Sequence, residues 1–90
     1  MDAERRAEAA KQILGNPAFD EAMRVMREEV VAQWGACSAQ DVKSREWLWM
    51  FYQNTLKFEG MLRGFIDTGR LAKLDRERSA IEKVTGLFKK

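Results

Sequence analysis

The sequence predicts an all-α protein: an antiparallel helical hairpin with a long central helix and flanking N- and C-terminal helices, three to four helices in all. Apolar residues recur every three or four positions along most of the chain, which is the period of an α-helix. No segment alternates apolar and polar residues as a half-buried strand does, and no Asn-Gly pair marks a hairpin turn. Glycine, proline and helix-capping residues divide the helical pattern into its elements.

A short N-terminal helix should end near Leu14. The Gly15-Asn16-Pro17 sequence predicts a stop and a restart, because glycine suits a helix C-terminus, asparagine caps a helix and proline is tolerated in a first helical turn. The apolar strip of this helix is small, so we expect the helix to contribute little to the core. The strip consists of Ala7, Ala10, Ile13 and Leu14.

The second helix is predicted over residues 17–34. Its apolar residues follow steps of three or four and therefore share one face, which we expect to be buried. They are Phe19, Met23, Met26, Val30 and Trp34. The acidic residues of this segment fall on the outer face, where solvated side chains are expected rather than a catalytic or metal site. They include Asp20, Glu21, Glu28 and Glu29.

The long central helix is predicted over residues 39–68. It should begin just after Ser38, or after Asp41 if that residue is the cap, and Thr68-Gly69 should end it. Steps of three and four define its buried seam, which comprises Leu48, Phe51, Thr55, Phe58, Leu62 and Phe65. With Phe51 as the centre of the buried face, Trp47 also falls within about 60° of it.

A separate C-terminal helix over residues 71–90 completes the predicted fold. Its apolar residues can share one side, although Arg78 interrupts the middle. They are Leu71, Leu74, Ile81, Val84 and Phe88. We expect this helix to dock by its ends, or only in the presence of a partner.

Composition excludes most catalytic chemistry. Ninety residues allow one domain, so residues 1–90 are predicted to form a single helical unit. The chain has no histidine and one cysteine, Cys37, which excludes an imidazole base, an internal disulfide and a paired-cysteine metal site. We expect no enzymatic activity and no catalytic, cofactor-binding or metal-binding residue. No secretory signal or membrane span is evident, which favours a protein made in the cytoplasm.

The central helix carries more apolar surface than a two-helix core can cover. Trp49 and Leu56 lie far from the predicted seam, and Val42, Gly60 and Gly64 lie on the same far side. Each glycine inside a helix costs about 1 kcal/mol relative to alanine, so two of them one turn apart suggest the close approach of another backbone. Either these five residues contact a second copy or another protein, or the first or last helix of the same chain covers them.

The C-terminal segment suggests an alternative function. The net charge is only +2, yet residues 70–90 hold seven basic and three acidic side chains. A small nucleic-acid-associated or regulatory factor would place such basic residues at phosphates, whereas a solvated helix face explains the same pattern without a ligand. The candidate phosphate contacts are Arg70, Lys73, Arg76, Arg78, Lys83, Lys89 and Lys90. An inhibitor of a host protein is a third interpretation.

Two short stretches carry a family resemblance. They are Ile13-Leu14-Gly15-Asn16-Pro17-Ala18-Phe19 and Ile66-Asp67-Thr68-Gly69-Arg70-Leu71-Ala72, with Asp41 in the polar turn between them. Over residues 4–74 the chain resembles small helical proteins encoded in the virion and assembly gene clusters of tailed bacteriophages and prophages. The resemblance implies a non-enzymatic structural or assembly accessory that acts by helix-mediated binding and self-association. Its expected partners are itself or a capsid, portal or tail component, in the host cytoplasm or incorporated in the virion.

Overall fold

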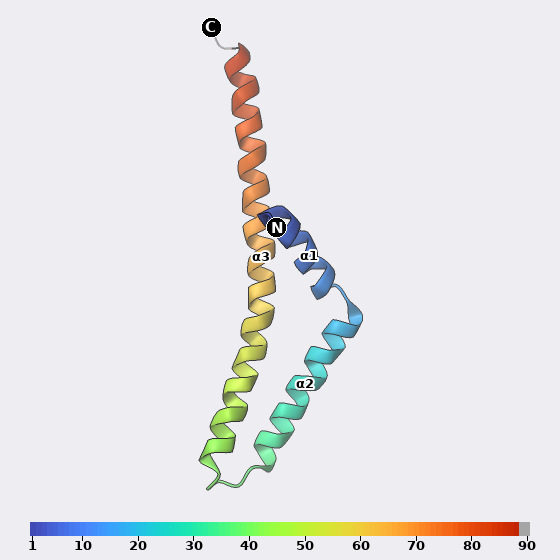
Figure 1. Ribbon diagram of the computed structural model, residues 1–90, viewed down its shortest axis with the longest axis vertical. Helices are drawn as coiled ribbons and strands as arrows, with labels where there is room; N and C mark the ends of the chain where they lie inside the picture. The colour runs from blue at the N-terminus through green and yellow to red at the C-terminus, as the bar shows by residue number, and fades with distance from the viewer. Residues whose placement is uncertain (89–90) are drawn as a thin grey trace.

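The computed structural model describes residues 1–88 and contains three α-helices over them: α1 (Ala3–Leu14), α2 (Pro17–Ala36) and α3 (Val42–Phe88). No strand occurs in these residues, so the prediction of an all-helical protein is confirmed. Figure 1 shows α2 beside the first part of α3 and running in the opposite direction, while α1 packs against the middle of α3. The remainder of α3 projects alone, and the molecule measures 77 × 26 × 18 Å.

The first two predicted breaks are helix boundaries. Asn16 Oδ1 accepts a hydrogen bond from the backbone N–H of Ala18 at 2.8 Å, and Pro17 is the first residue of α2. Asp41 Oδ1 accepts from the N–H of Ser44 at 3.2 Å, so α3 begins after Asp41, the second of the two predicted start points. Local capping chemistry therefore accounts for both boundaries.

The predicted break at Thr68-Gly69 is wrong. α3 continues through Gly69 to Phe88, so the helices predicted over residues 39–68 and 71–90 are one helix of 47 residues. A Cβ atom on Gly69 would overlap the Cβ of Ala7 and lie 2.8 Å from the carbonyl oxygen of Ala3. Gly69 therefore allows α1 to approach α3 closely, and it does not terminate the helix.

The expectation that the N-terminal helix contributes little to the core is also wrong. Ala7 and Ala10 are 6% and 1% exposed, and both belong to the buried apolar set of the molecule. At the same contact the Arg6 guanidinium lies 5.1 Å from the centre of the Phe65 ring. Ala7 and Ala10 are buried because they are small: together with Gly69 they let the backbones of α1 and α3 approach closely.

The buried line on α3 follows seven-residue steps through Leu48, Thr55, Leu62 and Gly69. Opposite it, α2 contributes Met23 and Val30, and Phe19 and Met26 are half-buried, so the predicted apolar face of this helix is largely correct. Three predicted core aromatics are instead substantially exposed, two because the buried line of α3 passes beside them and one because it lies in the last turn of α2. They are Trp34, Trp47 and Phe58, at 47%, 62% and 48%.

A half-buried polar cluster joins α2 to α3 within this apolar contact. The Arg27 Nε–H donates to Thr55 Oγ1 at 3.2 Å, and Thr55 donates to the backbone oxygen of Tyr52 at 2.7 Å. Arg27 Nη2 also lies against Glu59 Oε1 as an ion pair, without the alignment of a hydrogen bond. These directional contacts fix how α2 is placed along α3.

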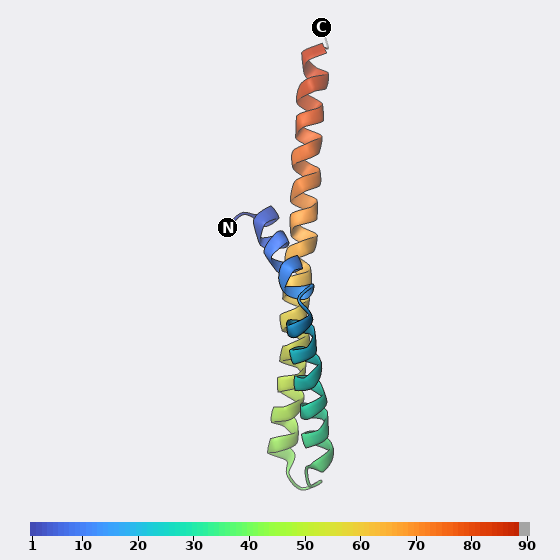
Figure 2. The same ribbon diagram turned by 90° about the vertical axis from the view of Figure 1, so that its right-hand side faces the viewer.

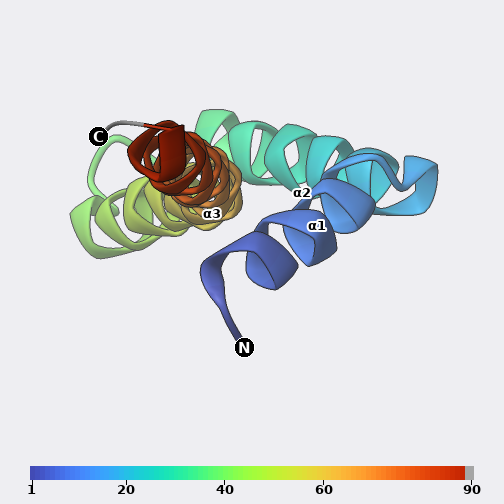
Figure 3. The same cartoon turned by 90° about the horizontal axis from the view of Figure 1, so that it is seen from above.

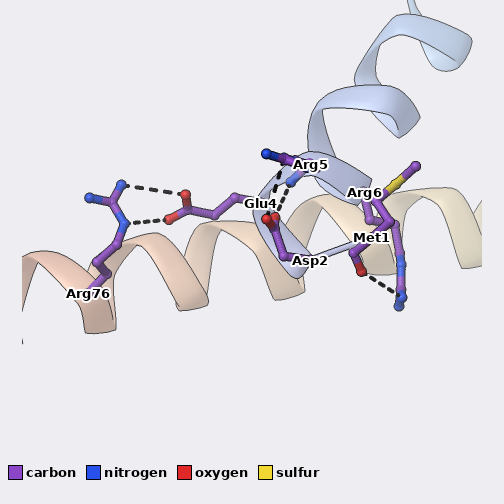
Figure 4. Close-up of polar contacts among 6 residues, drawn as sticks. All are labelled: Met1, Asp2, Glu4, Arg5, Arg6 and Arg76. Atoms are coloured by element: carbon purple, nitrogen blue, oxygen red, sulfur yellow. Dashed lines mark hydrogen bonds and ion pairs between the residues drawn. The ribbon is translucent and has the colours of Figure 1, made fainter.

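Beyond the contact with α1, α3 has no neighbour among the described residues. Side chains from Lys73 to Gly86 are all exposed, and Figure 2 shows this part of the helix extending past both other helices. One contact secures its base: Arg76 Nε and Nη2 donate to the two carboxylate oxygens of Glu4 at 3.1 and 3.5 Å (Figure 4). The hydrogen bond and charge of Glu4 raise the pKa of Arg76 further above its ordinary value.

Candidate protein interface

A shallow groove runs between α2 and α3 beside the turn that joins them. Trp34 of α2 and Trp49 of α3 line it along most of its length. Near the turn the groove is completed by Val42 and Arg45, and farther along by Val31 and Tyr52. The helices place these side chains together because α2 and α3 run antiparallel from a short connection.

The groove is apolar, aromatic and open to solvent. Trp49 is 60% exposed and Val42 is 54% exposed. The Arg45 guanidinium lies 5.5 Å from the centre of the Trp34 ring, which puts one fixed cation at the edge of the aromatic surface. Exposed tryptophan beside arginine is the side-chain combination that dominates binding energy at many protein interfaces.

The five predicted interface residues do not form one continuous strip. Val42, Trp49 and Leu56 follow seven-residue steps and lie about 110° from the buried line of α3, on the side that faces the groove. Gly60 and Gly64 lie about 150° from that line, which places them opposite α1 and α2. A Cβ atom at either glycine would meet nothing within 4 Å. The structure therefore separates a groove-side group from a glycine group.

The other helices of the chain leave Trp49 uncovered. α1 packs near Gly69, and the segment after residue 71 continues along the axis of α3 instead of folding back. The alternative in which the first or last helix covers all five residues is therefore wrong for this chain. A last helix that covers these residues would have to fold back after Gly69, whereas α3 is continuous there.

A second unpartnered surface lies on the side of α3 opposite α1 and α2. We call it the back face, and it comprises Gly60, Gly64, Leu71, Leu74 and Ile81. The three large residues are 64%, 56% and 65% exposed in that order. Because the helix is continuous through Gly69, the glycine pair and the apolar residues of the C-terminal half form one stripe, which a helix break would have separated.

Three arginines of the C-terminal half are paired with carboxylates. Arg76 is held by Glu4, while Arg70 and Arg78 lie 3.3 and 3.4 Å from the carboxylates of Asp67 and Asp75. Arg78 also points to the opposite side of the helix from Arg76. Lys73 and Lys83 are exposed, and Lys89 and Lys90 lie outside the described residues. Phosphate binding by this segment stays a prediction.

The remaining candidates are the acidic residues of α2 and the single cysteine. Arg24 lies 3.9 Å from a carboxylate oxygen of Glu21 and 2.8 Å from one of Glu28, on the exposed face of α2 where solvated side chains were expected. Cys37 is a free, half-buried residue that caps the end of α2. Within residues 1–88, no three histidine, cysteine, aspartate or glutamate side chains gather into a potential metal site.

Sequence reasoning missed three features of these surfaces. Trp34 was assigned to the core although its place in the last turn of α2 leaves it beside solvent, and its pairing with Arg45 depends on the tertiary structure. The Arg27 to Glu59 pair has no local signal, because its partners are 32 positions apart. The position of Gly69, one turn beyond Phe65, is clear from the sequence, but its role in close packing depends on the placement of α1.

No helix in the described part of the chain is long and apolar enough to cross a membrane. Comparison with known proteins found no matching family model, no matching curated protein and no matching solved structure.

Proposed function

We propose that the chain is a non-enzymatic accessory protein that works through helix-mediated binding, by self-association and by docking on another protein. The observation that carries this proposal is the surface area. The chain exposes 7402 Å², whereas a compact monomer of 10.4 kDa exposes about 5,400 Å². No large side chain among the described residues is fully buried, so the isolated chain lacks the dense core of a self-sufficient domain.

Several of the exposed large apolar side chains gather on the groove and on the back face. Trp34, Val42 and Trp49 line the groove, and Leu71, Leu74 and Ile81 lie on the back face. Large exposed apolar surface on a soluble chain commonly marks an interaction site. These side chains are apolar and can bury surface against a partner, but they cannot act as an acid, a base or a nucleophile, so the two surfaces favour binding over catalysis.

The proposed setting is the assembly or the virion of a tailed bacteriophage, with a capsid, portal or tail component as the docking partner. This part of the proposal depends on the resemblance of the Ile13–Phe19 and Ile66–Ala72 stretches. The structure gives both stretches a physical role: the first contains the cap between α1 and α2, and the second contains the glycine that receives α1.

Sedimentation of the purified chain at micromolar concentrations tests self-association, and a strict monomer would count against it. Affinity capture from prophage-induced cells tests docking, with a Trp49→Ser variant as the matched control because Trp49 is exposed and its loss should leave the fold intact. Enrichment of a phage structural protein by the native chain and not by the variant supports the proposal. Recovery of DNA that disappears as salt is raised would favour phosphate binding by the basic segment instead.

A further inference from the structure

We propose that the back face of α3 is the interface of an antiparallel homodimer in which Leu71 of one copy faces Leu74 of the second copy. This inference rests on the self-association proposed above and specifies its geometry. Figure 3, a view along α3, shows α1 and α2 together on one side of the helix. The opposite side can therefore receive a second α3 without displacing either of them.

The back face has the spacing of a coiled-coil seam. Alternating steps of four and three connect residues 60, 64, 67, 71, 74, 78, 81 and 85 along α3. This alternation keeps one line of side chains facing a neighbouring helix. Three seam positions carry large apolar residues, two carry glycine, and Asp67 and Arg78 carry opposite charges. In the single chain Asp67 pairs with Arg70, and Arg78 pairs with Asp75, at the exposed helix surface. Burial of these charges in a seam is least costly where each also meets an opposite charge across the interface.

One antiparallel register satisfies the size and charge requirements of the seam together. When Leu71 faces Leu74 of the second copy, Gly64 faces Ile81 and Asp67 faces Arg78. The gap left by the glycine then receives a large side chain, and each seam charge meets its opposite. The flanking residue Arg70 falls beside Glu77 of the second copy. Two-fold symmetry makes every one of these contacts occur twice.

Other pairings bring like charges together. A shift that places Leu71 opposite Ile81 sets Asp75 against Asp75 and Glu77 against Glu77 of the second copy. A parallel, in-register pair stacks Arg78 on Arg78 and Asp67 on Asp67. Both arrangements are disfavoured by repulsion, so the sequence of this face is self-complementary in one orientation.

The surplus exposed surface of the whole chain is larger than the area that a stable dimer buries on each partner. The chain exposes about 2,000 Å² more than a compact monomer of its mass. A standard interface buries about 800 Å² on each partner. Residues 60–85 of the two copies overlap over about 39 Å of helix. A second copy is the favoured occupant, because one set of residues supplies both members of each complementary pair.

Exchange of Gly64 and Ile81 tests the size match. The Gly64→Ile variant has open space in the single chain, so it should keep its helix content and yet weaken the dimer by about tenfold or more. The double variant Gly64→Ile/Ile81→Gly has the original composition and should recover most of the lost affinity. Sedimentation equilibrium gives the dissociation constants. Unchanged or higher affinity of the Gly64→Ile variant overturns the register.

Exchange of Arg70 and Glu77 tests the charge match independently. Arg70→Glu and Glu77→Arg should each weaken the dimer by about three- to tenfold, and the double variant should restore it. Lys83→Glu is the matched control for Arg70→Glu, since it makes the same change in net charge on the opposite side of the helix and should leave affinity unchanged. A double variant that is weaker than both single variants contradicts the pairing.

Spin-label distances test the orientation. With Cys37→Ala as background, single labels at Lys73→Cys and Lys83→Cys should give distances that differ by roughly 15 Å or more in the antiparallel dimer. Equal distances would show a parallel pair and overturn the proposal.

A strict monomer would overturn the dimer and self-association together, whereas docking through the Trp49 groove is measured separately and would survive. A dimer whose affinity is unchanged by the Gly64/Ile81 and the Arg70/Glu77 substitutions overturns the proposed register but leaves self-association in place.

Discussion

At the scale of single residues, the contact between α1 and α3 depends on a position that has no side chain. Gly69 lies where a Cβ atom would overlap Ala7 and press against the backbone oxygen of Ala3. A backbone atom cannot rotate away as the end of a flexible side chain can, so the helices would have to separate. The three other glycines of α3, at positions 60, 64 and 86, have open space around them.

Gly69→Ala should therefore loosen the docking of α1, with a cost of about 1–3 kcal/mol that exceeds the gain in helix propensity. Gly60→Ala is the control: in dilute, monomeric protein it should stabilise α3 by about 0.5–1 kcal/mol. Urea unfolding followed by circular dichroism measures both, and hydrogen exchange of the α1 amides localises the first. Equal stabilisation by both substitutions would contradict the close contact at Gly69.

The Arg27, Thr55 and Glu59 cluster is a second case in which single residues decide packing. Both charged side chains are largely buried, with 22% and 17% of their surfaces exposed. Glu59→Ala would leave the guanidinium of Arg27 partly desolvated and without its counter-charge, which should cost about 2 kcal/mol of unfolding free energy. The exposed Arg24 to Glu28 pair serves as the control, since Glu28→Ala should change stability by less than about 0.5 kcal/mol. Chemical denaturation that finds the two variants equal would contradict the role of the cluster.

At the scale of elements, the predictability of each helix boundary depends on where its cause lies. The starts of α2 and α3 are set by Asn16 and Asp41, which bond to backbone groups two and three residues away, so the sequence alone predicts them. The continuity of α3 through Gly69 goes with the packing of Ala3 and Ala7 against that glycine. These two residues belong to α1 and lie more than sixty positions away in the chain. A glycine that ends a helix cannot be distinguished in the sequence from a glycine that allows two helices to pack closely.

The projecting part of α3 should be stable only when it is covered. An isolated helix of this length is marginal in water, and only the base of the projection is tied to α1. Hydrogen exchange of amides from Asp75 to Gly86 should therefore be fast in dilute protein and slow at concentrations where copies associate. Amides near Leu48 and Thr55 serve as the internal reference, because α2 already covers them. Slow, concentration-independent exchange in the projection would contradict this account.

At the scale of the whole molecule, the extended shape supports the proposal that the chain acts together with a partner. The radius of gyration is 21.1 Å, whereas a compact chain of 90 residues has a value of about 12 Å. Helical periodicity predicted the surplus of apolar surface on α3, including Trp49 and Leu56. It could not assign that surplus to separate surfaces, because Trp49 shares a groove with Trp34 only after α2 has folded onto α3.

The two surfaces lie in different parts of α3, so their functions should be separable by mutation. Leu71→Asp/Leu74→Asp should abolish self-association and leave the groove unaltered, because both residues are exposed on the back face and line no part of the groove. Trp49→Ser should do the reverse, since Trp49 lines the groove and is absent from the proposed dimer seam. Sedimentation measures the first property, and capture of a phage structural protein measures the second. Loss of both properties in both variants would mean that docking requires the dimer, in which case the groove and the back face act as one surface.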